Sequence, residues 1–289
     1  MTDGPIPRIP LGDWVEQGVD WVTDTFRPFF DLVKDVLSGA YDGLSEVLLA
    51  PPFWVVALLL VLVALLAKGG KLALVSLAGF VVVAGVDQWE NAMKTLALVL
   101  LASVIALLVA IPVGIWAARN DTVSAVVRPV LDFMQTMPAF VYLIPTVVIF
   151  LTGVVPGIVA TVIFALAPGV RFTELGIRQV DAEVVEAGQA FGATPGRILR
   201  QVQLPLALPT IMAGVNQVIM LALSMVVISG MVGAEGLGRD VVSALSSVDV
   251  GSGFEAGIAV VILAIYLDRV TAGLSARAPV AKALATSRA

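Results

Sequence analysis

The chain has 289 residues, of which 59% are hydrophobic and 13% are charged, whereas an average soluble domain has roughly 25% charged residues. A mean hydropathy of +1.00 excludes a soluble globular protein, and the absence of His and Cys excludes imidazole-based triads, the usual zinc sites and disulfides. The formal net charge of −5 argues against a nucleic-acid partner. Charge-free stretches long enough to cross a bilayer recur along the chain, so we expect an all-α polytopic membrane protein.

Residues 1–47 differ from the rest of the chain and predict an acidic amphipathic segment. The first fifty residues hold nine acidic and three basic side chains, with bulky residues such as Trp14 and Trp21 at helical spacing. We expect one or two helices, interrupted at Pro28, that lie on the membrane surface. An interfacial helix that binds an anionic leaflet carries Lys and Arg on its polar face, so this Asp-rich face favours the extracytoplasmic side.

Seven apolar stretches follow, and each is a candidate transmembrane helix. They are residues 48–67, 72–86, 95–118, 129–152, 154–170, 208–232 and 254–272. The first two stretches, with the connection that ends at residue 94, form an accessory unit (48–94), and the core domain spans 95–275. No charge occurs between Phe133 and Val170, but the prolines and glycines there predict a hairpin that turns near Gly153.

The basic residues indicate the orientation. Of the 17 Lys and Arg residues, twelve fall in one set of alternating connections: Lys68, Lys71, Arg119, Arg128, Arg171, Arg178, Arg197, Arg200, Arg269, Arg277, Lys282 and Arg288. The other set, which includes the N-terminus, holds five. The positive-inside rule therefore places the N-terminus outside and the tail 276–289 in the cytoplasm.

The predicted crossings offer little chemistry of their own. No ionisable side chain lies at the middle of a crossing, and Asp132 has Arg128 four residues earlier as a partner. A coupled carrier normally needs buried charges, so a secondary carrier or channel is the weaker alternative. An intramembrane enzyme has less support still, because without His or Cys only Ser/Lys or carboxylate chemistry remains. No phosphate-binding Gly-x-x-x-x-Gly-Lys-Ser/Thr loop is present, so any ATP is bound by another chain.

The connection that begins at Arg171 carries the most informative motif. Its residues are Glu186, Ala187 and Gly188, then Gly192, and after nine further residues Val202, Gln203, Leu204 and Pro205. This pattern resembles the cytoplasmic Glu-Ala-Ala signature of ABC importer permeases, although Gly188 replaces the second Ala and Val202 replaces Ile. We expect a helix near residues 181–193, capped by Asp181 and ended by Gly192. The resemblance implies that it couples the chain to an ATPase, whereas an ordinary amphipathic loop helix is the alternative.

Longer segments resemble the permease of glycine betaine/proline importers, the osmoprotectant uptake family. They read WENAMKTLALVLLASVIALLVAIPVGIWAAR, RPVLDFMQTMPAFVYLIPTVVIF and LPLALPTIMAGVNQVIMLALSMVVISGMVGAEGLG, and cover most of the stretch from Trp89 to Gly238. The resemblance implies the transmembrane domain of a type I ABC importer in a bacterial cytoplasmic membrane, with about seven transmembrane helices. It also implies a substrate such as glycine betaine or proline, with choline or carnitine as the alternative.

The same resemblance implies the partners. They are a second copy of the chain in a homodimer, two cytoplasmic ATPase subunits and a separate extracytoplasmic substrate-binding protein. ATP and Mg²⁺ would be bound by the ATPase, so no cofactor is expected in this chain.

Five polar residues in the crossings are candidates for a translocation path. They are Gln135, Thr136, Asn216, Gln217 and Ser224. Neutral amides and hydroxyls could offer hydrogen bonds to a carboxylate. The alternative is that they join helices to one another, as polar side chains in membrane bundles commonly do.

Overall fold

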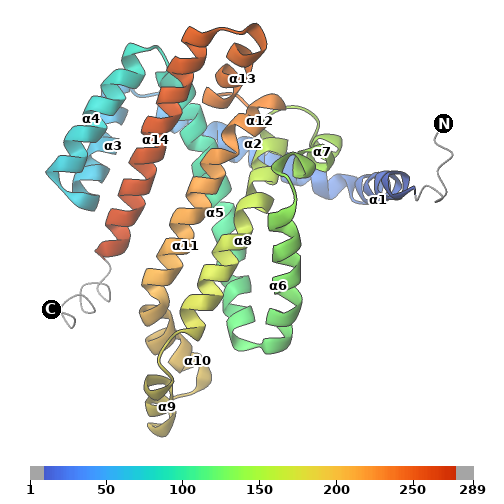
Figure 1. Cartoon of the computed structure of the whole chain (residues 1–289), viewed down its shortest axis with the longest axis vertical. Helices are drawn as coiled ribbons and strands as arrows, with labels where there is room; N and C mark the ends of the chain where they lie inside the picture. The colour runs from blue at the N-terminus through green and yellow to red at the C-terminus, as the bar shows by residue number, and fades with distance from the viewer. Residues whose placement is uncertain (1–9, 278–289) are drawn as a thin grey trace.

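The computed structural model describes residues 10–277, and in this range the chain is helical with no strand. The helices are α1 (Leu11–Thr25), α2 (Arg27–Leu49), α3 (Phe53–Lys68), α4 (Gly70–Gly85), α5 (Trp89–Arg119), α6 (Asp121–Thr136), α7 (Ala139–Phe150), α8 (Val154–Arg178), α9 (Ala182–Ala190), α10 (Pro195–Ile198), the π-helical turn η1 (Leu199–Gln203), α11 (Leu204–Ser224), α12 (Val226–Met231), α13 (Leu237–Ser247) and α14 (Val250–Ala276). The all-α prediction is confirmed. We call the two ends of the bundle the α9 end and the α13 end (Figure 1).

Three long helices form the centre of the bundle. α8 packs against both α5 and α11, while α14 packs against α11 on one side and α3 on the other (Figure 1). Small residues allow the close approach of α5 and α8: a Cβ added to Gly114 would lie 2.6 Å from the Cβ of Thr173. Such contacts between small residues are typical of helix packing in membranes, where van der Waals contact replaces the hydrophobic effect as the driving force.

The crossings differ in shape from the seven helices that the sequence predicts, although helices cover most of each predicted stretch. Within residues 10–277, four helices are long and apolar enough to span a bilayer: Trp89–Arg119, Val154–Arg178, Pro195–Met231 and Val250–Ala276. Two bent pairs, α2 with α3 and α6 with α7, raise the number to at most six, and Gly70–Gly85 is a shorter apolar helix. The sixth predicted crossing, 208–232, belongs to the continuous helix Pro195–Met231 and therefore begins earlier than predicted.

The prediction of one helix over 129–152 is wrong, because α6 and α7 meet at a bend of 95°. Met137 adopts an extended conformation (φ −74°, ψ 136°) directly before Pro138. A proline disfavours the helical conformation of the preceding residue and cannot donate a backbone hydrogen bond, so the helix ends there. The first crossing, 48–67, is also interrupted: α2 ends at Leu49 and α3 begins at Phe53 after two prolines, with a bend of 99°.

The N-terminal segment forms two helices, as expected, and lies across the bundle near the α13 end (Figure 1). The interruption falls at Phe26, with Pro28 in the first turn of α2. No side chain of α1 is buried among the described residues, whereas α2 packs against α5 and places Phe30 edge-on against Phe150, with ring centroids 5.8 Å apart. The predicted turn near Gly153 is confirmed: Gly153 has a φ of +134° and immediately precedes α8.

Candidate functional site

The helix α9 stands clear of the bundle at the end that bears its name (Figure 1). Its N-cap is Asp181, whose carboxylate accepts a hydrogen bond of 2.9 Å from the backbone N–H of Glu183. None of its described side chains is buried, so Glu186 and Ala187 are available to a partner. Gly192, two residues beyond the helix, has a φ of +76° and no atom within 4 Å of an added Cβ. The predicted capped helix is therefore present, with a positive-φ turn after it.

The second half of the motif lies apart from the first. Leu204 and Pro205 begin α11, and Leu204 packs with Ile177 and Leu199 in an apolar cluster. Gly188 connects the two halves, since a Cβ there would meet the side chain of Ile198 at 3.5 Å. The exposed part of the motif is thus seated on α10, and α10 leads through η1 into the long helix Pro195–Met231.

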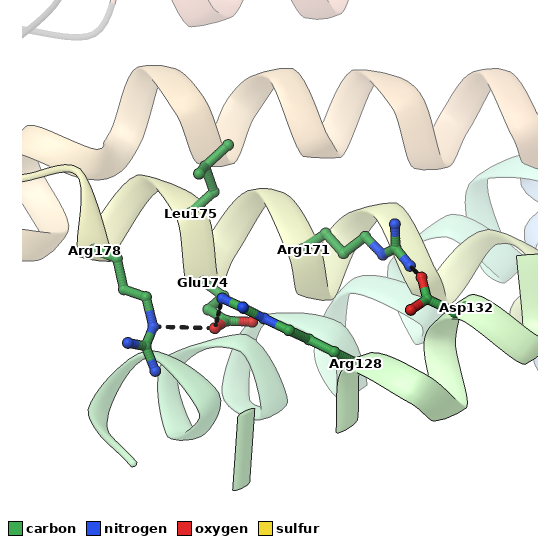
Figure 2. A pocket seen from close by; sticks show the side chains of 6 residues that line it. All are labelled: Arg128, Asp132, Arg171, Glu174, Leu175 and Arg178. Atoms are coloured by element: carbon green, nitrogen blue, oxygen red, sulfur yellow. Dashed lines mark hydrogen bonds and ion pairs between the residues drawn. The ribbon is translucent and has the colours of Figure 1, made fainter. Parts of the chain in front are cut away.

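An ion-pair cluster joins α6 to α8 and is formed by Asp121, Arg128, Asp132, Arg171, Glu174 and Arg178. Figure 2 shows these residues except Asp121. Its centre is Glu174, whose side chain is 4% exposed. One carboxylate oxygen, Oε1, accepts hydrogen bonds from Ser124 at 2.7 Å and from Arg128 at 2.8 Å, and it forms an ion pair with Arg178 at 3.0 Å. The sequence predicts that Arg128 pairs with Asp132, but this is wrong: Asp132 pairs with Arg171. Each charged side chain of α6 in the cluster pairs with a residue of α8, and Arg128 and Asp132 do not pair with each other.

The cluster borders a cleft of about 270 Å³. Its charged groups pair with one another and hold α6 against α8, so the cluster has a structural role and does not present a reactive group. Only Ser124 and Leu131 of α6 are buried, so apolar packing of this helix is sparse. A buried carboxylate is costly unless it is paired and hydrogen-bonded, and here two guanidinium groups and one hydroxyl provide this. The α6–α8 contact therefore combines charge pairing with the packing of Leu131 against Ala167 and Val170, and the sequence does not predict the charge pairing.

Four of the five path candidates are exposed in a single chain: Gln135, Thr136, Gln217 and Ser224. Thr136 and Ser224 use their hydroxyls locally, donating to the carbonyls of Phe133 at 2.9 Å and Met220 at 3.0 Å. Gln217 and Ser224 lie on one face of α11, because positions seven residues apart fall on the same side of a helix. Gln135 and Thr136 lie at the end of α6, just before the bend into α7.

Asn216, the fifth candidate, joins two helices. Its amide nitrogen donates to a carboxylate oxygen of Asp268 at 3.0 Å, and its amide oxygen accepts from the hydroxyl of Thr271. Both partners lie on α14. The contact corresponds to the alternative reading of these residues as interhelical links.

The α13 end has a second polar network and a glycine contact. Lys94 pairs with Glu235 at 2.7 Å and with Glu90 at 2.9 Å. The ammonium of Lys94, through its hydrogen bond and its charge, holds the pKa of Glu235 below its usual range. Close by, Gly238 packs against α12: an added Cβ would lie 2.6 Å from the carbonyl carbon of Val226. No group of three metal-ligating side chains occurs in residues 10–277.

The chain resembles proteins of known class along nearly its whole length. It is 48% identical to the glycine betaine transport system permease protein OpuAB of Bacillus subtilis over 94% of this chain and 96% of the relative. It is 49% identical to the glycine betaine/carnitine transport permease protein GbuB of Listeria monocytogenes, over 94% of this chain and 98% of the relative. It is 46% identical to the glycine betaine/proline betaine transport system permease protein ProW of Escherichia coli, over 91% of this chain and 74% of the relative.

The fold agrees with these sequence similarities. A structure of the MetNI methionine ABC transporter in an inward-facing conformation matches with a TM-score of 0.57 at 23% identity, covering 62% of this chain and 92% of that chain. Residues 110–278 match the family described as "Binding-protein-dependent transport system inner membrane component". The chain therefore belongs to this family and is a multi-pass, non-catalytic permease subunit of an ABC importer, which works with an ATPase and a binding protein.

Proposed function

We propose that this permease carries glycine betaine, or a closely related osmolyte such as proline, into the cell. The observation that carries the substrate assignment is the near full-length similarity, at 46–49% identity, to three permeases whose names share glycine betaine. Glycine betaine has a quaternary ammonium that donates no hydrogen bond and a carboxylate that accepts several. The neutral candidates Gln135, Thr136, Gln217 and Ser224 suit a weak, transient path for such a zwitterion, because none of them would trap either charge.

In this proposal the working assembly is a homodimer with two ATPase subunits and a separate extracytoplasmic receptor. The α11 face that carries Gln217 and Ser224 is exposed in the single chain, which supports a second copy beside it. ATP and Mg²⁺ are bound by the ATPase. Residues 95–275 form the core domain, 48–94 the accessory helices, 1–47 an extracytoplasmic segment and 276–289 a cytoplasmic tail.

We assign the coupling role to α9 and its flanking residues: Glu186, Ala187, Gly188, Gly192, Leu204 and Pro205. The exposure of α9 and its direct path through α10 and η1 into α11 support this role. A rigid-body movement of a docked α9 would reach the crossing through the short turn at residues 191–194 and the contact of Gly188 with Ile198 on α10.

We place the α9 end in the cytoplasm and the N-terminus outside. The support is the concentration of basic residues at the α9 end, including Arg119, Arg197 and Arg200. The chain lacks Cys, so single Cys probes report cleanly. Ser246 and Gln201 are both exposed and lie at opposite ends of the bundle. In intact cells an impermeant thiol reagent should label Ser246→Cys and leave Gln201→Cys unlabelled; the reverse result would invert the topology.

The substrate is tested with the purified complex in proteoliposomes. Uptake of labelled glycine betaine should require the permease, its ATPase, its receptor and ATP. Efficient uptake of choline or carnitine without glycine betaine would refute the substrate and leave the importer class intact. Uptake that persists without ATP would instead favour a carrier. The mass of the solubilised complex tests the homodimer, because one permease per two ATPases would exclude it.

A further inference from the structure

Three arginines surround a cleft where the last turn of α5 meets α10 and η1. They are Arg119, Arg197 and Arg200, and the cleft has a volume of about 530 Å³. Within residues 10–277 no acidic side chain lines it, and none of the three arginines forms an ion pair. Its local charge is therefore uncompensated by any described residue.

Other arginines of the same end are neutralised inside the chain, which makes this cleft different. Arg128, Arg171 and Arg178 all pair with carboxylates in the ion-pair cluster. In the arginine cleft, by contrast, Arg197 donates a hydrogen bond to a neutral group, the side-chain oxygen of Gln201, at 3.0 Å. Guanidinium groups match the geometry of phosphate oxygens and bind them through paired hydrogen bonds. The cleft thus has the chemistry of a phosphate site.

An apolar groove continues directly from the cleft along α5. Its lining residues are Pro112, Ile115, Trp116, Arg119 and Asn120, so Arg119 belongs to both. Trp116 is 62% exposed, as expected of an indole at a membrane interface. From Arg119 to Pro112 the helix rises by about 10 Å toward the centre of the span, at 1.5 Å per residue. The groove therefore leads from the charged cleft along α5 toward the middle of a helix that is long and apolar enough to cross a bilayer.

The two parts are held together by packing. Ile115 and Ala118 of α5 contact the apolar cluster that contains Leu199 of η1. The arginines of η1 and α10 are therefore fixed relative to the end of α5. A free phosphate would use the cleft but not the groove, whereas a phospholipid would use both.

We infer that the cleft of Arg119, Arg197 and Arg200 binds the phosphate head group of an anionic phospholipid, with an acyl chain along the groove at Trp116. This lipid seals the junction between α5 and η1. The inference rests on the chain spanning a bilayer and is independent of the transported substrate.

The test uses quenching of Trp116 by brominated lipids. The full chain is purified with its other four tryptophans, Trp14, Trp21, Trp54 and Trp89, replaced by Phe, and placed in phosphatidylcholine nanodiscs. Phosphatidylglycerol with brominated acyl chains, present as a minority lipid, should quench Trp116 more strongly than brominated phosphatidylcholine at the same mole fraction. Each of the three Arg→Gln substitutions should lower this preference by about fivefold, since one basic residue near a membrane surface contributes about that factor.

The control is Arg269→Gln, which removes an exposed arginine of α14 that pairs with Asp268 and lies outside the cleft, and it should leave the preference unchanged. The Arg→Lys variants keep the charge and should retain part of the preference, which separates binding from misfolding. Equal quenching by the two lipids would overturn the inference. Relief of quenching by millimolar inorganic phosphate would assign the cleft to a free anion, and loss of ATPase binding in the Arg→Gln variants without a change in quenching would assign it to the protein partner. Either result would overturn the lipid site.

Discussion

A substitution series at Gly192 tests the docking of α9, because the structure separates backbone strain from contact with a partner. Gly192 has a φ of +76°, and an added Cβ meets no described atom within 4 Å. Ala in this conformation carries a strain of roughly 1–2 kcal/mol. Leu carries the same strain and finds the same open space. Within the isolated chain, Gly192→Ala and Gly192→Leu should therefore have nearly equal thermal stability.

The two variants should differ only when the ATPase is present. If α9 sits in a groove of the ATPase, the larger Leu overfills the contact and costs about 1–3 kcal/mol. The dissociation constant of the permease–ATPase complex should then rise by about 5- to 150-fold from Ala to Leu. Asn tolerates the left-handed conformation, so Gly192→Asn adds volume with little strain and serves as the control for folding.

The measurement is a titration of the solubilised permease with purified ATPase, followed by substrate-stimulated ATP hydrolysis in proteoliposomes. Equal dissociation constants for the Ala and Leu variants would refute docking at this turn. A large loss of stability in Gly192→Leu alone, without ATPase, would refute the reading of the turn as open space.

Three further predictions concern interactions inside the chain. Glu174→Gln should lower the free energy of unfolding in a denaturant titration by about 2 kcal/mol, which is less than for a fully buried pair because the arginines of Glu174 are partly exposed. Asp132→Asn should lower it by at most about 1 kcal/mol in the same titration. Gly238→Ala forces a Cβ against the backbone of α12 and should cost about 1–3 kcal/mol, whereas Gly257→Ala meets open space and should be neutral or stabilising. The pKa of Glu235 is lowered in the folded chain, so the ion pair of Glu235 stabilises the fold above the unfolded pKa of about 4.3, and this stabilisation is lost as the pH falls through the folded pKa. Glu235→Gln should therefore lose less thermal stability on acidification than the parent chain. An equal loss in both proteins would refute the pairing.

Local signals in the sequence predict the parts of the site that depend on neighbours along the chain. Asp181 caps α9 because an Asx side chain can reach the N–H two residues later, whatever the tertiary structure. Gly192 and Gly153 adopt positive φ because only glycine does so without strain. The capped helix, the turn after it and the hairpin turn at Gly153 therefore follow from the residues themselves.

Contacts between distant helices could not be predicted in the same way. The i, i+4 spacing of Arg128 and Asp132 suggests a pair, but Glu174 lies 46 positions along the chain from Arg128 and offers a buried, better-supported carboxylate. Hydropathy also carries no information on the direction of a helix axis, so the 95° bend after α6 was hidden inside one apolar stretch despite Pro138. Close approach at Gly238 likewise depends on which helix packs beside it.

The continuous helix Pro195–Met231 gives the molecule a mechanical lever. Its 37 residues, at a rise of 1.5 Å each, extend for about 55 Å. A rotation of only about 5° around the end beside α9 would displace the opposite end by about 5 Å, by simple geometry from that helical rise. A displacement of this size is comparable with the width of a small methylated ammonium group. In the proposed coupling mechanism, a slight pivot at one end of the bundle would therefore open or close a passage at the other end without any change in secondary structure.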